Sequence, residues 1–99
     1  MIQILRLRVR DYEAWKPVFD EHMGLRSGYG CLRHTIYRAA RSPNDLTIVL
    51  EFVSHARSEE FSRSRPLSEA MGRAGIVGTP EWVLVERVED VAYGEPEAA

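Results

Sequence analysis

The chain has 99 residues, of which 44% are hydrophobic and 28% are charged. This composition is ordinary for a folded domain and excludes a disordered or collagen-like chain, and the length predicts one domain. The formal net charge is −2 and the basic residues are scattered among acidic ones, so we expect no binding to nucleic acid or to a membrane surface.

The sequence also indicates a cellular compartment. It contains one cysteine, Cys31, which excludes an intramolecular disulfide and is typical of a reducing environment. Residues 1–6 read MIQILR and form no long apolar core, so they resemble neither a signal peptide nor a membrane span. We therefore expect a cytoplasmic protein.

The first predicted element is a strand over residues 2–9, which is rich in Ile, Leu and Val. One parity carries Leu5, Leu7 and Val9, whereas the other carries isoleucines and arginines. Successive side chains of a strand point to opposite faces of a sheet, so this pattern predicts two different faces.

A helix is predicted next, with Asp11 as its N-cap. Pro17 removes a hydrogen bond from the helix interior, which predicts either a kink or a separate first turn before the main helix. We expect Gly24, Gly28 and Gly30 to end the helix. Its inward stripe, at the spacing of an amphipathic helix, consists of Trp15, Val18, Phe19, His22 and Met23.

Two β-rich runs follow, over residues 31–39 and 46–53. Between them lies a Ser-Pro-Asn-Asp sequence, which is typical of a turn. The pattern predicts a hairpin whose turn covers residues 40–45.

The charges in the hairpin predict its register. If Tyr37 opposes Thr47, then Arg33 opposes Glu51, and opposite charges lie directly across the two strands. A slip by one residue would place Glu51 among apolar neighbours, so we predict the first register. The face that should then meet the helices carries Leu32, His34, Ile36, Ile48, Leu50 and Phe52.

A second helical region and a last strand complete the chain. Ser54 can cap the helical region, and Pro66 should divide it into two pieces. The last strand is predicted over residues 81–88, so the domain spans residues 1–89 and residues 90–99 form a flexible tail. The apolar positions of the second helical region are Phe61, Leu67, Ala70, Met71 and Ala74.

The order β, α, β, β, α, β predicts an α+β, ferredoxin-like fold, with both helical regions on one face of an antiparallel-rich sheet. Residues such as Val49 and Val83 indicate that the other face is also partly apolar and needs a cover. A second copy of the same sheet would supply that cover with two-fold symmetry, so we expect a homodimer.

Five short segments carry a family resemblance, namely DYEAWK at 11–16, FDEH at 19–22, SPND at 42–45, EF at 51–52 and MGRAG at 71–75. Through these segments, residues 2–88 resemble the dimeric α/β-barrel superfamily, which includes antibiotic-biosynthesis monooxygenases, small polyketide cyclases and many uncharacterised proteins. The resemblance implies a barrel made of two packed sheets, with helices outside and a pocket between the sheet and the helices of each monomer. Members range from cofactor-free oxygenases to haem-degrading enzymes and proteins without known activity, so the fold does not select a reaction.

The candidate catalytic residues are His22 and His34, which we expect to converge between the first helix and the sheet. Each could act as a general acid or base, or each could be a packing residue with a hydrogen-bond partner. The predicted face of Trp82 depends on a strand register that the sequence leaves open. The candidate substrate-binding residues, which could instead be ordinary core, are Trp15, Phe19, Met71 and Trp82.

No metal or cofactor is expected. The two histidines are far apart in the sequence, and Cys31 is predicted to lie on the opposite parity from His34, so no three metal ligands converge. The glycines near residue 75 form no phosphate-binding motif. Haem degradation in related folds uses a histidine on the second helix, whereas His55 stands only at its start.

The sequence thus supports two functional hypotheses and does not decide whether the protein is an enzyme. The first is a cofactor-independent monooxygenase or cyclase that acts on an aromatic or polyketide-like compound. The alternative is a non-catalytic homodimer that binds a small ligand or serves in assembly. A cavity shared by both histidines would favour the enzyme.

Overall fold

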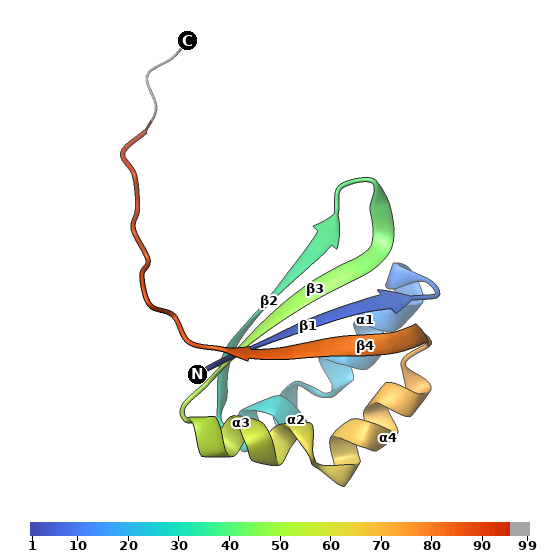
Figure 1. The fold of residues 1–99 in the computed structure, drawn as a ribbon. Helices are drawn as coiled ribbons and strands as arrows, with labels where there is room; N and C mark the ends of the chain where they lie inside the picture. Colours follow the sequence, from blue (N-terminus) through green and yellow to red (C-terminus); the bar gives the residue numbers. More distant parts are fainter. Residues whose placement is uncertain (96–99) are drawn as a thin grey trace.

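The computed structural model describes residues 1–95, which form a sheet with helices on one of its faces (Figure 1). The sheet has four antiparallel strands in the order β2-β3-β1-β4, as predicted for a ferredoxin-like fold. The strands are β1 (Ile2–Val9), β2 (Cys31–Ala39), β3 (Ser42–Phe52) and β4 (Ile76–Val85). The helices are α1 (Tyr12–Glu21), α2 (Met23–Gly28), α3 (His55–Ser62) and α4 (Arg65–Arg73).

The first helical region consists of two helices that meet at His22. α1 is continuous through Pro17, so no separate first turn forms, and the exposed position of Pro17 leaves the freed carbonyl group within reach of water. The predicted stop at Gly24 is wrong, because α2 includes both Gly24 and Gly28. Met23 is consequently displaced from the inward stripe and is 53% exposed.

The second helical region has the predicted caps and the predicted break. The Ser54 hydroxyl accepts a hydrogen bond from the Arg57 amide at 3.2 Å, and Pro66 lies in the first turn of α4. A further cap appears at Ser64, whose hydroxyl accepts a hydrogen bond from the Leu67 amide at 3.3 Å. These caps satisfy amide groups that have no partner inside the helices.

The hairpin register is confirmed: Arg33 pairs with Glu51 and Tyr37 with Thr47. The Arg33 Nε atom lies 3.9 Å from a carboxylate oxygen of Glu51. His34 therefore lies on the helix side of the sheet, as the predicted register requires.

The turn of the hairpin is shorter than predicted. β3 already begins at Ser42, so the turn comprises residues 40–41. Pro43 lies where the register between β2 and β3 shifts, and a bulge tolerates proline because no ladder hydrogen bond is needed there. The Asn44 side chain accepts a hydrogen bond from the Tyr12 amide at 2.8 Å and joins this bulge to the start of α1.

A second register shift, between Cys31 and Arg33, corrects the prediction for the start of β2. Cys31 pairs with Phe52 and packs against the core, whereas Leu32 is 71% exposed. The prediction that Leu32 faces the helices and that Cys31 lies on the opposite side from His34 is therefore wrong, because the shift exchanges their faces.

β4 begins five residues before the predicted range of 81–88 and ends three residues before its end. Pro80 is tolerated because β4 is an edge strand with one neighbour. Trp82 pairs with Leu5, which places both side chains on the helix side and settles the face of Trp82.

Residues 86–95 form neither helix nor strand, and the last four residues of the predicted tail lie outside the described range. The flexibility of the tail stays a prediction. Within residues 1–95, no helix combines the length and the apolar character needed to span a membrane.

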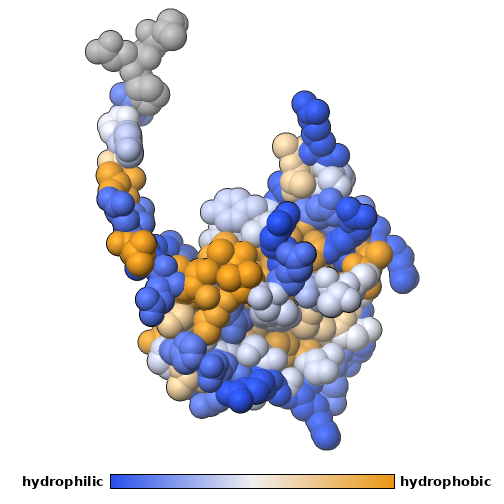
Figure 2. All heavy atoms as spheres, viewed as in Figure 1, coloured by the Kyte–Doolittle hydropathy of each residue, from blue (hydrophilic) through white to orange (hydrophobic). Residues whose placement is uncertain are grey.

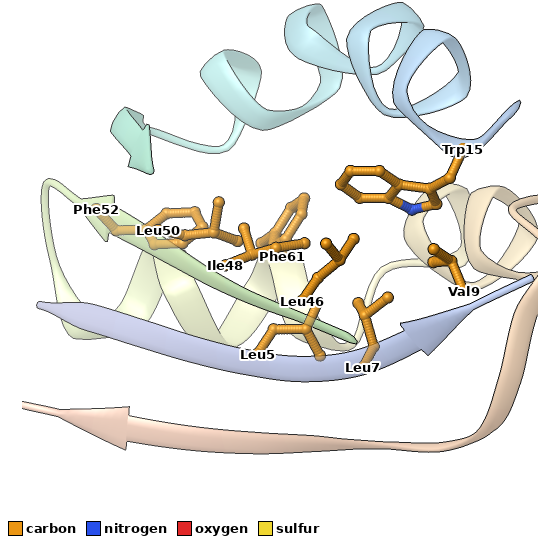
Figure 3. Packing of buried hydrophobic residues seen from close by; sticks show 9 residues of the cluster. All are labelled: Leu5, Leu7, Val9, Trp15, Leu46, Ile48, Leu50, Phe52 and Phe61. Atoms are coloured by element: carbon orange, nitrogen blue, oxygen red, sulfur yellow. The ribbon is translucent and has the colours of Figure 1, made fainter. Parts of the chain in front are cut away.

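The core lies between the sheet and the helices (Figure 3). The predicted inward parity of β1 is confirmed, because Leu5, Leu7 and Val9 are all buried. Each such aliphatic side chain contributes roughly 1.5–3 kcal/mol when it is fully buried. The other members of the buried cluster are Trp15, Leu46, Ile48, Leu50, Phe52 and Phe61.

Candidate functional site

A cavity of about 70 Å³ lies between the sheet and helices α1, α2 and α4, and it opens to solvent. We call it the helix-side cavity. Its wall is largely apolar, and the two ionisable side chains that line it are His22 and Arg26. All four candidate substrate-binding residues also line it, namely Trp15, Phe19, Met71 and Trp82.

Aromatic rings form one side of this cavity because α1 presents them one helical turn apart. The rings of Trp15 and Phe19 lie 4.9 Å apart between centroids, and Trp15 is buried. Trp82 is 37% exposed on the edge strand β4. A flat apolar molecule entering the cavity would therefore contact aromatic surface on both α1 and the sheet.

The hydrogen bond of His22 defines the state of its imidazole ring. The Nδ1 atom lies 2.7 Å from the carbonyl oxygen of Val18. A carbonyl oxygen can only accept, so Nδ1 carries the proton and donates it. In the neutral ring Nε2 is then unprotonated and can accept a proton from a molecule in the cavity.

His34 does not line the helix-side cavity, contrary to the expectation that both histidines share one space. Its ring packs edge-on against Phe19, with centroids 5.0 Å apart, and Phe19 is the residue that faces the cavity. Partial burial lowers the pKa of His34, and the positive charges of Arg26 and Lys16 lower it further. These effects favour the neutral form of the ring, and the catalytic role of His34 stays a prediction.

Arg26 is the polar residue of the cavity that the sequence analysis missed. It is only 5% exposed, and its guanidinium lies 3.6 Å above the centroid of the Phe19 ring. The spacing of Trp15, Phe19, His22 and Arg26 is four, three and four residues, so Arg26 continues the inward stripe by one turn. The sequence spacing therefore indicates Arg26, but the sequence analysis did not include it because the helix was predicted to end at Gly24.

The opposite face of the sheet carries a larger and more polar hollow of about 660 Å³, which we call the open-face hollow. Tyr37, Arg6 and Glu81 are among the side chains that line it. This face has no helices over it (Figure 1). Its volume measures a broad depression on an uncovered sheet, whereas the helix-side cavity lies between two layers and has the more apolar wall, as expected for a small-molecule site.

Hydrophobic side chains are also exposed on the open face. Val83, which is 53% exposed, lies in one row with Ile4 and Val49 on the neighbouring strands. Figure 2 shows hydrophobic surface gathered near the point where the C-terminal segment leaves β4.

Metal-ligating side chains do not gather at either place. Within the described part of the chain, no group of three or more His, Cys, Asp or Glu side chains is arranged to hold an ion.

No protein-family model and no curated protein matches this sequence. Solved structures do match. A candidate antibiotic biosynthesis monooxygenase from Bordetella bronchiseptica superposes with a TM-score of 0.77 at 15% identity, over 89% of this chain and 96% of that one. A single-residue variant of SnoaB, a cofactor-independent oxygenase from Streptomyces nogalater, gives 0.75 at 18% identity, over 91% and 94%.

A third match is Rv0793 from Mycobacterium tuberculosis, with a TM-score of 0.70 at 14% identity over 92% of this chain and 97% of that one. The chain has the fold of the antibiotic biosynthesis monooxygenases. The resemblance inferred from the sequence is thus confirmed for the fold, and identities this low carry no conclusion about the reaction.

Proposed function

We propose that this protein is a small-molecule pocket protein that acts as a cofactor-independent monooxygenase on an electron-rich aromatic or polyketide-like compound. The observation that supports it best is the helix-side cavity, in which aromatic walls surround an imidazole with a free nitrogen. The fold shared with SnoaB, a cofactor-independent oxygenase, agrees with this proposal.

The chemistry follows from the absence of a cofactor in the proposed reaction. The electrons that reduce oxygen must then come from the substrate, so the substrate needs an acidic C–H bond next to a carbonyl group or an aromatic ring. A base removes that proton, the resulting carbanion reduces and binds O₂, and the peroxide loses water. The net change is CH₂ + O₂ → C=O + H₂O, which needs no outside reductant.

In this scheme His22 is the base, with Nε2 as the accepting atom. Trp15 and Phe19 hold the ring of the substrate, and their apolar surfaces exclude water from the carbanion. Met71 and Trp82 complete the wall on α4 and β4. His34 supports the site from behind Phe19.

The size of the cavity adds a requirement. At about 70 Å³ it is well below the roughly 300–1,000 Å³ of ordinary ligand pockets, so a substrate ring must displace side chains. Met71 is unbranched and can change rotamer at low cost, and Trp82 is partly exposed at the edge of the sheet. We expect these two residues to move when the substrate binds.

The same proposal includes a homodimer. The open face of the sheet exposes Val83 in one row with Ile4 and Val49, and an apolar sheet face is normally covered. A second copy packed sheet to sheet would cover it on both chains at once.

Oxygen uptake with anthrone tests the proposed reaction. Anthrone is a tricyclic aromatic ketone with an acidic CH₂ group, and its product in this scheme is anthraquinone. After treatment with EDTA and without any added flavin or haem, the protein should consume one O₂ per anthrone at a rate above buffer. A rate equal to that of buffer would contradict the monooxygenase for this class of substrate.

One observation favours the second candidate, a non-catalytic ligand-binding module. Only one of the two candidate histidines lines the cavity, so the site offers a single imidazole for proton transfer. Binding of 2-naphthol, detected by calorimetry, without oxygen uptake from anthrone would support this candidate over the enzyme.

A further inference from the structure

Arg26 carries a buried guanidinium group. Its side chain is 5% exposed, and its Nε and Nη2 atoms are buried with no hydrogen-bond partner within residues 1–95. Asp20, whose negative charge acts on Arg26 from a distance, has both carboxylate oxygens 2.7 Å from the Lys16 ammonium. The nearby carboxylate is thus already engaged by another cation.

The contact with Phe19 explains only part of this arrangement. A guanidinium 3.6 Å above an aromatic ring is attracted to the electron-rich face of the ring, and the attraction is stronger when the pair is desolvated. A contact with the ring face provides no acceptor for the N–H groups of Nε and Nη2, which point outward in the guanidinium plane. Leaving a buried charged donor without an acceptor destabilises the folded protein, so the contact with Phe19 alone does not account for the burial of Arg26.

The two free atoms form a fork. In an arginine side chain the N–H bonds of Nε and of the neighbouring Nη2 point in the same direction and are nearly parallel. This pair matches the two oxygens of a carboxylate, which arginine binds through two parallel hydrogen bonds. The contact with Phe19 and the burial of Arg26 restrict the movement of the guanidinium, so little side-chain freedom is lost when a ligand binds.

We propose that the fork of Arg26 binds a carboxylate carried by the ligand of the helix-side cavity, so that the ligand is an aromatic carboxylic acid. The inference rests on the proposed function for the place where the ligand lies, and it adds the ligand's charge and chemical class. The ring of the ligand contacts Trp15 and Phe19, while its carboxylate replaces the missing partner of Arg26. Burial lowers the pKa of Arg26, and the charges of Cys31 and Asp20 offset only part of this effect.

The test compares two ligands of the same shape by calorimetry. 2-Naphthoate carries the carboxylate, and 2-naphthamide is its neutral counterpart. Hydrogen bonds to a charged group are worth about 1.5–3 kcal/mol, so the wild-type protein should bind naphthoate about 10- to 100-fold more tightly. Equal affinities, a preference for the amide, or no naphthoate binding would each overturn the proposal.

Single substitutions of arginine show which residue causes the preference for naphthoate. Arg26→Met keeps the length of the side chain and should lose the preference for naphthoate while still binding naphthamide. Arg26→Lys keeps the charge but not the fork, and it should retain only part of the preference. Arg6→Met, on the open face, should behave as wild type. If Arg6→Met abolishes the preference and Arg26→Met does not, the anion site is on the other face and the proposal is wrong.

This test is independent of catalysis. Arg26→Met removes an unpaired buried charge, so we expect it to fold, and a thermal melt checks this. If Arg26→Met does not fold, the comparison of the two ligands on the wild-type protein and on Arg26→Lys still tests the proposal. If the protein prefers naphthoate but consumes no oxygen with anthrone, the carboxylate site at Arg26 is supported and the proposed monooxygenase reaction is contradicted.

Discussion

The most specific chemical feature of a single residue is the hydrogen bond from His22 Nδ1 to the Val18 carbonyl. His22→Asn can keep a donor near Nδ1 but provides no basic nitrogen. If His22 is the base, oxygen uptake with anthrone should fall by about 100-fold or more, since general bases contribute about 10²–10⁴-fold. Measurements with an oxygen electrode at saturating anthrone check this.

The matched control for this change is His55→Gln. His55 is exposed, contacts Glu59 on α3 and does not line the cavity, so its replacement should leave oxygen uptake unchanged. The melting temperature of His22→Asn should remain close to wild type. A variant that melts much earlier, or that retains full activity, would identify His22 as a packing residue.

The lowered pKa of His34 makes stability depend on pH. Burial first, and then the charges of Arg26 and Lys16, favour the neutral ring in the folded state. Below about pH 6.5, His34 binds a proton more readily in the unfolded chain than in the folded one. The free energy of unfolding therefore decreases as the pH is lowered from about 6.5 to the pKa of His34 in the folded state. The contribution is fully present above that window.

Replacing His34 by Gln should remove this dependence. Urea denaturation at pH 7.5 and at pH 5.5 would show a larger loss of unfolding free energy for wild type than for His34→Gln. Two parallel pH profiles would show that His34 titrates in the same way in both states.

For single residues, the sequence predicts which side chains line the cavity wherever the regular period of a helix continues. The 3.6-residue period placed Trp15, Phe19 and His22 on the cavity wall. It failed for Arg26, because two glycines in α2 were interpreted as the end of the helix. It also failed to show that Phe19 lies between the cavity and His34, since only tertiary packing determines which of two inward residues covers the other.

Among the elements, the junction between α2 and β2 places Arg26 and depends on Gly30. Gly30 has φ = +86°, and a Cβ atom there would lie 2.8 Å from the Val53 Cγ2 atom. Gly30→Ala should therefore lower the free energy of unfolding by about 1–2 kcal/mol from the backbone alone, and by more from the contact. Urea denaturation measures the change.

Gly72→Ala is the matched control for this substitution. Gly72 lies in α4, no atom is within 4 Å of the position of its Cβ, and alanine favours a helix by up to about 1 kcal/mol. We expect this variant to be as stable as wild type or more stable. Equal effects of the two substitutions would mean that the conformation of Gly30 is not required.

The boundaries of elements show why prediction from sequence is uneven. Opposite charges fixed the β2–β3 register, and a serine and a proline fixed the start of α3 and the break before α4. Pro43 was predicted to lie in the turn and the last strand was predicted to begin after Pro80, yet both prolines lie within strands, at a bulge and at a sheet edge. Where a proline is tolerated depends on which neighbours a strand has, and that is a property of the assembled sheet.

For the whole molecule, the prediction concerns the uncovered face of the sheet. Val83→Asp would place a charge among Ile4 and Val49, and it should dissociate a dimer packed through that face. Sedimentation at micromolar concentration should show wild type near twice the chain mass of 11.3 kDa and the variant near that mass.

Met23→Asp provides the control, because Met23 is equally exposed but belongs to the helix layer. It should leave the dimer intact. A wild-type protein that sediments as a monomer would contradict the homodimer and leave the open face to another partner.

The central claim is that small aromatic molecules bind on the helix side of the sheet. An NMR titration with 2-naphthol, which carries no carboxylate, tests it most directly. We predict that the largest chemical-shift changes occur at Trp15, Met71 and Trp82, which line the helix-side cavity. Changes concentrated at Tyr37 and Val77, which line the open-face hollow, would contradict the claim, as would the absence of any change.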